Sequence, residues 1–238
     1  MKKEKPTDSK PDPRIMEEVL DILRSRSAKA LSMAKKEILA MSLEGRGGEA
    51  LKHYATDWDD TSHPGILSLT CEAVGGQPER VVPIQVATLI LTAAMDVHDD
   101  IIDGSRTKNG KTTVFGKFGK DISILVGDAL LFKGLTMLHE ACETLPKEQK
   151  KAILELVKQA FFGISSAEAE ETSFRGKFDV SPEEYLDMIR TKVAVAEATA
   201  KIGVILGDGT PQEVEELGHY GRTLAILMTI RDEFVDVF

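Results

Sequence analysis

The sequence has little cysteine, few aromatic residues and no excess of positive charge. It holds two cysteines, Cys71 and Cys142, whose spacing matches no metal site, so a zinc module or a disulfide-rich scaffold is excluded. The net charge of −9 and the lack of long lysine or arginine clusters exclude a nucleic-acid-binding surface. We therefore expect an intracellular protein with reduced thiols, located in the cytoplasm.

Long hydrophobic runs are also missing. The longest weakly polar run, Pro83 to Val97, is too short to span a membrane and contains Gln85 and Asp96. Residues 1–13 carry charge and proline with no apolar stretch behind them, which predicts a disordered tail and neither a signal peptide nor an anchor. Residues 14–238 suffice for a single domain with one hydrophobic core.

Apolar residues recur at helical spacing along nearly the whole chain. Two helix starts are marked by a capping residue, a proline and a glutamate three residues on: Ser181-Pro182-Glu183-Glu184 and Thr210-Pro211-Gln212-Glu213. No pair of segments alternates with the period of a strand. The fold class is therefore all-α, a multi-helix bundle. We expect helices over 14–44, 65–73, 79–103, 121–143 and from Pro146 to Gly163 or beyond, with irregular segments at 45–63 and 104–119.

Four carboxylates fall within eight residues where the apolar helix over 79–103 ends: Asp96, Asp99, Asp100 and Asp103. Their like-charge contacts three and four residues apart cost the helix about 1–2 kcal/mol without a counter-ion. A bound Mg²⁺ would turn this repulsion into a net stabilisation, because Mg²⁺ prefers carboxylate oxygens and also binds substrate phosphate. A solvated acidic face is the alternative interpretation. The apolar residues interleaved with the acids favour carboxylates at the rim of an apolar pocket.

A second cluster with the same acid-acid-x-x-acid pattern lies near the end of the chain: Asp232, Glu233 and Asp236. One such cluster is a weak signal, because acidic pairs are common on helices. Two clusters, each at the end of an apolar helix, are more specific. Facing each other across a bundle, they could hold two or three Mg²⁺ ions and, through them, a diphosphate.

The stretch from Val97 to Asp103, followed by Gly110-Lys111-Thr112-Thr113-Val114, resembles the first aspartate-rich motif of the trans-polyprenyl diphosphate synthases. Further similar segments keep that family's order over residues 64–238: Cys71 to Gly76, Gly127 to Leu131, Tyr185 to Lys192, and Tyr220-Gly221-Arg222 before the second motif. The resemblance implies an isoprenoid-synthase-type helical bundle around a central prenyl pocket. It also implies a Mg²⁺-dependent prenyltransferase that ionises an allylic isoprenoid diphosphate.

The resemblance assigns the acidic residues to metal. Asp99 and Asp103 would ligate two Mg²⁺ ions with Asp100 in support, and the second motif would hold a third through Asp232 and Asp236.

The same resemblance assigns two lysines to the substrate. Lys192 is similar to the family lysine that binds the allylic diphosphate, and Lys108 stands where an arginine has the same role. The expected catalytic residues are thus Asp99, Asp100, Asp103 and Lys192. Ala94 and Met95 fall where the family sets product length, and neither is a large aromatic residue, so no ceiling below C15 is indicated.

The basic residues that hold isopentenyl diphosphate in this family have no counterpart here. The family's Gly-Gly-Lys-x-x-Arg-Pro falls on residues 58–64, where lysine is replaced by Asp60 and arginine by His63. Thr92 and Asn109 replace two further polar or basic residues. An aspartate in place of lysine repels a phosphate, so we expect an atypical isopentenyl diphosphate site. The chain also ends two residues after the second motif, where family members continue with more helices.

Three functions remain open. The first is prenyl transfer to isopentenyl diphosphate despite the altered pocket. The second is a lyase, cyclase or coupling enzyme that ionises an allylic diphosphate and uses water, an internal alkene or another acceptor. The third is a non-catalytic subunit that pairs with an active relative. In each case we expect a homodimer or a heterodimer with a paralogue.

Overall fold

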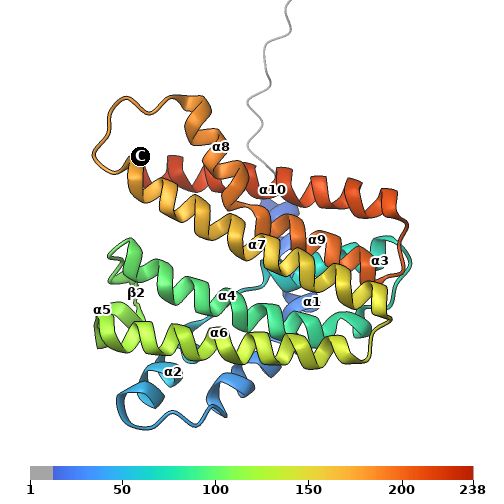
Figure 1. The fold of residues 1–238 in the computed structure, drawn as a ribbon, viewed down its shortest axis with the longest axis horizontal. Helices are drawn as coiled ribbons and strands as arrows, with labels where there is room; N and C mark the ends of the chain where they lie inside the picture. Colours follow the sequence, from blue (N-terminus) through green and yellow to red (C-terminus); the bar gives the residue numbers. More distant parts are fainter. Residues whose placement is uncertain (1–12, 238) are drawn as a thin grey trace, which may run out of the picture.

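The computed structural model describes residues 13–237, with side chains from residue 14 to residue 232. The predicted N-terminal tail therefore lies outside the described residues, apart from Pro13, which already belongs to the first helix. The described residues form a helical bundle (Figure 1), so the predicted all-α class is confirmed. The helices are α1 (Pro13–Leu39), α2 (Gly45–Asp57), α3 (Ser62–Ala73), a 3-10 turn η1 (Pro78–Val81), α4 (Val82–Ile102), α5 (Val114–Phe118), α6 (Lys120–Glu143), α7 (Lys147–Phe174), α8 (Pro182–Lys192), α9 (Ala194–Leu206) and α10 (Pro211–Val237).

Both helix starts expected from capping residues are confirmed. At the start of α8, the Ser181 side chain accepts a hydrogen bond from the Glu184 amide at 3.2 Å, and the Ser181 amide donates to the Glu184 carboxylate at 2.8 Å. Thr210 and Glu213 make the same reciprocal pair before α10. Each pair provides acceptors for two backbone N–H groups that would otherwise lack a partner at the start of the helix.

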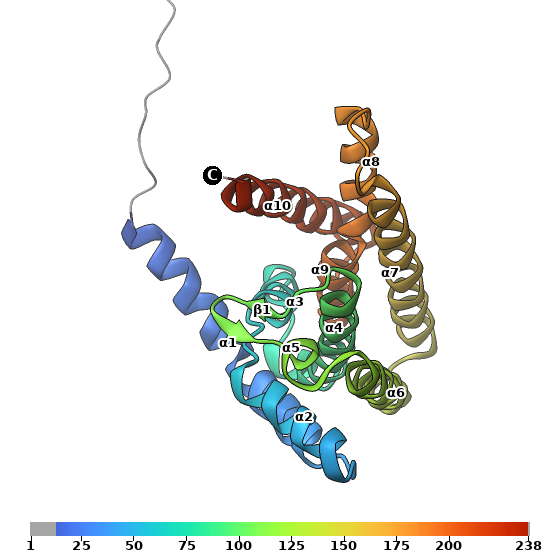
Figure 2. The same cartoon turned by 90° about the vertical axis from the view of Figure 1, so that its left-hand side faces the viewer.

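The apolar helix α4 lies at the centre of the bundle. It packs along α6, and α1, α3, α7 and α9 surround the pair (Figures 1 and 2). Close packing of α4 on α6 requires a glycine at 127, since a Cβ there would lie 2.3 Å from Nε2 of His98. The C-terminal ends of α4, α7 and α10 lie at the same end of the molecule (Figure 1). The buried core of α4 includes Leu89, Ile90, Ala93, Ala94 and Val97.

Two segments differ from the sequence-based expectation. Residues 45–57, predicted as irregular, form α2, because Ala50, Leu51, Tyr54 and Ala55 recur at helical spacing and are buried. The expected loop over 104–119 contains a short antiparallel hairpin of β1 (Thr107–Lys108) and β2 (Lys111–Thr112). Its two-residue turn is Asn109-Gly110, in which both residues have positive φ. Asn-Gly is the preferred sequence for such a turn, so this dipeptide was the signal for the hairpin.

Two described helices are long and apolar enough to cross a membrane by length and composition. They are Pro78–Ile102 and Lys120–Glu143, of which the most apolar windows are 61% and 33% buried. Both are longer than the run from Pro83 to Val97, on which the prediction of no membrane span was based. Because α4 and α6 pack against each other inside the bundle, both fit the role of core helices. The cytoplasmic location remains a prediction.

Candidate active site

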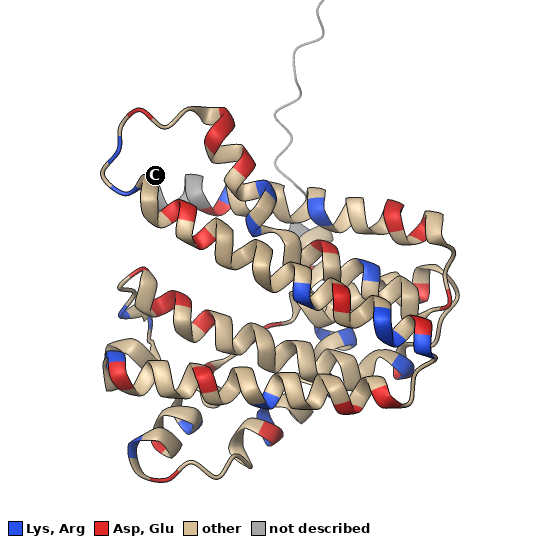
Figure 3. Cartoon of the chain, viewed as in Figure 1, with Lys and Arg blue, Asp and Glu red and all other residues tan. Residues whose placement is uncertain are grey.

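A cavity of about 1060 Å³ opens at the end of the bundle where α4 and α7 end. Its walls come from α3, α4, α6, α7, α8, α9 and α10. Apolar residues line the interior, among them Met95, Leu131, Phe161 and Ile164, while charged residues gather at the mouth. Figure 3 shows acidic residues on the facing ends of α4 and α7. The volume is at the upper end of the range for small-molecule sites, and the apolar interior suits a hydrocarbon chain.

Asp99 lines this cavity and has no hydrogen-bond or ion-pair partner among the described side chains. Burial, followed by the negative charges of Glu168 and Asp103, raises the pKa of Asp99 to about 7. Three carboxylates from α4 and α7 therefore converge here, and their mutual repulsion outweighs the opposing effects of Lys192 and Lys108. Such a site is stabilised when a cation enters it.

The α7 side of the mouth supplies the partners of Lys192. Its ammonium group contacts the carboxylates of Glu168 at 3.0 Å and Glu171 at 2.5 Å. Burial acts to lower the pKa of Lys192, but these two hydrogen bonds and charges outweigh burial and raise it. Lys192 therefore remains a cation at the cavity wall, where the sequence analysis expected a group that binds diphosphate.

Arg175, directly after α7, forms contacts with Asp103 and with the end of α4. The guanidinium contacts the Asp103 carboxylate at 2.6 Å and donates to the Ile102 carbonyl at 2.8 Å. Arg175 was not expected from the sequence, since it lies in no motif. Glu168 and Glu171 were missed as well, although acids three residues apart on one helix face form a recognisable pattern.

The carboxylates at the mouth fit Mg²⁺ in their chemistry. Within the described residues no three His, Cys, Asp or Glu side chains come close enough to hold a metal by themselves. Mg²⁺ does not require such a cage, because it is usually bound by one or two carboxylates together with water and substrate phosphate. Asp99, with its unpaired carboxylate and raised pKa, and Asp103, one turn further along α4, offer that set. Their role as ligands stays a prediction.

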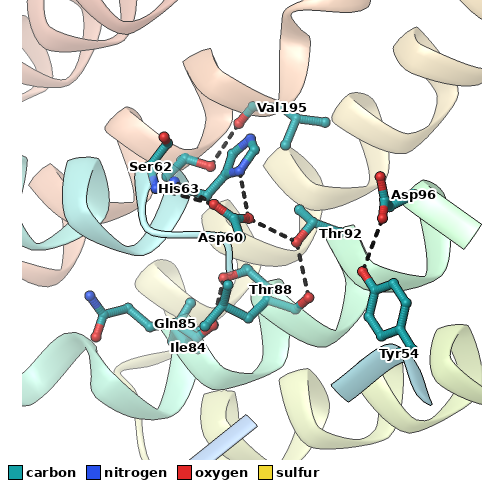
Figure 4. A network of polar contacts seen from close by, with 12 residues as sticks. Tyr54, Asp60, Ser62, His63, Ile84, Gln85, Thr88, Thr92, Asp96 and Val195 are labelled. Carbon is teal, nitrogen blue, oxygen red and sulfur yellow. Dashed lines mark hydrogen bonds and ion pairs between the residues drawn. The ribbon is translucent and has the colours of Figure 1, made fainter. Parts of the chain in front are cut away.

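Lys108 and Asp96 form an ion pair at 2.6 Å, one turn before Asp99 and Asp100 on α4. The Tyr54 hydroxyl donates to the second oxygen of Asp96 at 3.2 Å (Figure 4). Burial acts to lower the pKa of Lys108, but Asp96 outweighs it and raises the pKa. Asp96, which had no assigned role in the family motif, thus holds the lysine expected to bind the allylic diphosphate. Lys108 lines a second, smaller pocket, whereas Lys192 lines the cavity.

The second pocket, of about 580 Å³, lies where the resemblance would locate isopentenyl diphosphate. Its wall contains all four replaced positions: Asp60, His63, Thr92 and Asn109. Asp100 also belongs to this wall and is buried; burial, followed by the charge of Asp96, raises its pKa to about 6. The structure thus brings the four departures from the family motif together in one pocket.

Asp60 and His63 form an ion pair in that wall, with Nδ1 of His63 2.9 Å from Oδ2 of Asp60 (Figure 4). Burial acts to raise the pKa of Asp60, but the charge and hydrogen bonds of His63 outweigh it and lower the pKa. Burial acts to lower the pKa of His63, and the charge and hydrogen bond of Asp60 outweigh it and raise the pKa. The two replacements therefore form one coupled unit.

The second acidic motif differs in its surroundings. Asp232 is exposed on α10, forms an ion pair with Arg231 at 2.6 Å and does not line the cavity, although Thr229 does. The side chains of Glu233 and Asp236 lie outside the described residues. The third metal site expected from Asp232 and Asp236 therefore stays a prediction.

The family profile described as Polyprenyl synthetase matches residues 49–238. This chain belongs to that family. The match begins upstream of residue 64, where the sequence analysis set the start of the resemblance.

Several proteins that are similar to this chain come from archaea. A short chain isoprenyl diphosphate synthase of Methanothermobacter thermautotrophicus is 32% identical over 93% of this chain and 67% of its own length. A geranylgeranyl diphosphate synthase of Sulfolobus acidocaldarius is 31% identical over 79% of this chain and 57% of its own length. The crystal structure of geranylgeranyl pyrophosphate synthetase from Pyrococcus horikoshii superimposes with a TM-score of 0.86 at 30% identity, covering 93% of this chain and 67% of that one. The chain thus spans between about half and two thirds of the length of these relatives.

Proposed function

We propose that this protein is a Mg²⁺-dependent prenyltransferase that ionises an allylic isoprenoid diphosphate in the cavity bordered by Asp99 and Lys192. The single observation that supports it best is the pairing of an apolar cavity of about 1060 Å³ with unpaired carboxylate charge at its mouth. A prenyl diphosphate has the matching form, an apolar chain with a polyanionic head. Membership of the polyprenyl synthetase family supports the same reaction.

In this reaction the chain's own residues have separable tasks. Lys192, kept cationic by Glu168 and Glu171, binds the diphosphate oxygens at the cavity wall. Asp99 and Asp103 hold Mg²⁺, with Asp100 in support; when bound, the ion supplies positive charge that stabilises departing pyrophosphate. The apolar lining holds the prenyl chain and excludes water from the electrophilic carbon. Arg175, which now pairs with Asp103, is positioned to exchange that carboxylate for a phosphate oxygen.

One assay tests this proposal against the alternatives. Purified full-length chain is incubated with Mg²⁺ and farnesyl or geranylgeranyl diphosphate, with and without isopentenyl diphosphate, and released pyrophosphate is measured. We expect release under at least one of these conditions. Protein that releases pyrophosphate only after a paralogue is added would instead support the role of a non-catalytic subunit.

A second candidate function concerns the acceptor. Five aspartates line the second pocket, and its two lysines are both paired with carboxylates: Lys108 with Asp96 and Lys111 with Asp57. This arrangement favours an enzyme that couples the allylic cation to an acceptor other than isopentenyl diphosphate. Pyrophosphate release in the absence of isopentenyl diphosphate supports it, whereas release that requires both diphosphates supports condensation.

The expected oligomer has a candidate surface on α6. The outward side of this helix exposes Leu125, Phe132 and Leu135, and Phe132 is 76% exposed. Large apolar residues gathered on one helix favour association with another copy or with a paralogue. Sedimentation of the purified chain, compared with a Phe132→Glu variant, tests this: we expect the wild type to associate and the variant to be monomeric.

A further inference from the structure

The imidazole of His63 lies where the cavity and the second pocket meet. The two spaces share three lining residues, His63, Thr92 and Asp96. About a third of the His63 side chain, 34%, is exposed, so the ring is accessible from these spaces. His63 thus lies between the expected place of ionisation and a space of about 580 Å³ that can hold a second small molecule.

Asp60 fixes the orientation of that ring. Its Oδ2 atom is 2.9 Å from Nδ1 of His63 and accepts a longer hydrogen bond, at 3.4 Å, from the Thr92 hydroxyl. Its Oδ1 atom accepts the backbone amides of Ser62 and His63 at 3.1 and 3.3 Å. Because the ring and two backbone amides hold this carboxylate, it stays ionised and keeps its orientation, so it selects the tautomer of His63 with the proton on Nδ1 (Figure 4). Nε2 is then the nitrogen available to accept a proton.

The second pocket is built to accept hydrogen bonds. Its two lysines are paired with carboxylates, so they offer little to a diphosphate. His53, also in the wall, contacts the Thr112 carbonyl at 2.8 Å. Oδ1 of Asp100 is buried and has no hydrogen-bond partner among the described residues. This one unsatisfied carboxylate oxygen favours a hydrogen-bond donor, and a hydroxyl group is a neutral donor that the five aspartates do not repel.

We propose that the second pocket takes a neutral hydroxyl-bearing acceptor and that His63, oriented by Asp60, accepts its proton as the hydroxyl oxygen attacks the allylic carbon. This inference rests on the proposed function, because that carbon becomes electrophilic only as the diphosphate leaves. The bond between the allylic carbon and the diphosphate oxygen breaks, and its electron pair departs with pyrophosphate. A carbon–oxygen bond to the acceptor forms, and the hydroxyl proton passes to Nε2 of His63 and then to solvent. The product is a prenyl ether, or a prenyl alcohol when the acceptor is water.

In this step His63 is a catalytic residue and Asp60 a positioning residue. The other titratable side chains that border the two spaces are His53, Tyr54, Asp57, Asp59, Asp96, His98, Asp99, Asp100, Lys108, Lys111, Glu168, Arg175 and Lys192. Among them, Asp96 and Lys192 already have partners of opposite charge, and Asp60 is the group that contacts the ring. The pKa of His63 is raised above 6.5, so the neutral base forms only above that pH.

The test uses the full chain with Mg²⁺ and geranylgeranyl diphosphate, without isopentenyl diphosphate, and with glycerol as the probe acceptor. Pyrophosphate is measured separately from the glyceryl ether and the prenyl alcohol, which are identified by mass spectrometry. We expect both substitution products from the wild type, at a rate that increases with pH above 6.5. Saturating Mg²⁺ keeps Asp99 ionised, so in His63→Gln we expect a loss of at least about tenfold in both products and no such increase. Added imidazole should partly restore the rate of His63→Ala.

The matched control is His139→Gln, because His139 also contacts a carboxylate, Glu143 at 3.4 Å, but on the exposed side of α6. It should retain the wild-type rate and pH profile. Asp60→Asn should lower the rate and move the increase to lower pH, since Asp60 raises the pKa of His63.

Three outcomes contradict the inference in distinguishable ways. An unchanged rate and pH profile in His63→Gln would overturn the role of His63. Pyrophosphate release that strictly requires isopentenyl diphosphate would overturn the hydroxyl acceptor while leaving the proposed function intact. No release under any condition would overturn both. If His63→Gln fails to fold, the pH profile of the wild type still tests the inference. A rate that does not change between about pH 5 and about pH 9 is incompatible with a histidine base.

Discussion

Asp60 and Asp99 both lie in polar walls of the same bundle, but only the carboxylate of Asp60 has partners that stabilise its charge. Asp60 is paired with His63, accepts further hydrogen bonds, and has a lowered pKa. Asp99 has no partner among the described side chains, faces Glu168 and Asp103, and has a pKa raised to about 7. A carboxylate satisfied by the protein needs no ion, whereas one left among like charges is stabilised by a cation. This difference is the basis of our two proposals, a metal and diphosphate site at Asp99 and a site for a neutral molecule beside Asp60.

The largest effect should come from removing the unpaired carboxylate. Asp99→Ala eliminates the group on which the metal site depends most, so we expect pyrophosphate release to fall by at least about a hundredfold. The measurement is the rate with geranylgeranyl diphosphate at saturating Mg²⁺. Asp121→Ala, an exposed aspartate at the start of α6, is the control and should retain full activity. Wild-type activity in Asp99→Ala would refute the site.

Converting the satisfied site back to a basic one should have the next largest effect. Asp60→Lys with His63→Arg supplies two cations where the family binds isopentenyl diphosphate, so condensation with that substrate should increase about tenfold or more. Product analysis after incubation with both diphosphates provides the measurement. The single variant Asp60→Asn removes the repulsion without adding a cation and should gain less. No gain in the double variant would show that this pocket does not limit condensation.

The unpaired carboxylates should also make stability depend on pH. Burial and like charges raise the pKa of Asp99 to about 7 and of Asp100 to about 6, from 3.8. The folded protein therefore holds these protons to higher pH than the unfolded chain does. As the pH rises from about 4 to about 7, the free energy of unfolding should therefore fall by about 1–3 kcal/mol after solvent screening.

Denaturant titrations at several pH values, with chelator and then with Mg²⁺, measure this dependence. Mg²⁺ should restore stability at the upper end of the range, because it binds the ionised carboxylates of the folded state. In Asp99→Asn most of the slope should disappear. A wild-type stability that instead increased over this range would contradict the raised pKa values.

The smallest effect concerns the depth of the cavity. Met95 and Phe161 line both the cavity and a space of about 30 Å³ behind it, which is also bordered by Leu91 and Val157. Met95→Ala should join the two spaces and shift the preferred allylic substrate by about one isoprene unit toward longer chains. Competition between farnesyl and geranylgeranyl diphosphate measures the preference. Met137→Ala, at a methionine of α6 outside the cavity lining, should leave it unchanged.

Much of the fold could be predicted from the sequence because its signals are local. Capping residues mark the starts of α8 and α10, and apolar spacing marks α4, α6 and α7. The missed helix α2 begins with glycines, whose weak helix propensity is overridden by the burial of Leu51 and Tyr54. The missed hairpin has only two residues in each strand, too few to show alternation.

Only those residues of the candidate site that belong to a sequence motif could be predicted. Asp99 and Lys192 line the cavity, and Asp103 pairs with Arg175, which lines it too. Their surroundings depend on groups from elsewhere in the chain. Glu168, Glu171 and Arg175 approach them across the mouth, and such contacts depend on how α7 packs, which spacing within one helix does not reveal. The exchange of a basic set for an Asp60–His63 pair was visible in the sequence as two substitutions. That they contact each other required the structure.

The absence of a side chain at Gly127 has a consequence for the chemistry of a different helix. His98 presses against this glycine and is the immediate chain neighbour of Asp99. Even a methyl group at 127 would act as a wedge between α6 and α4 and would displace the imidazole. A substitution on α6 would thus act directly beside the carboxylate at the cavity mouth, through the residue that precedes it in the chain.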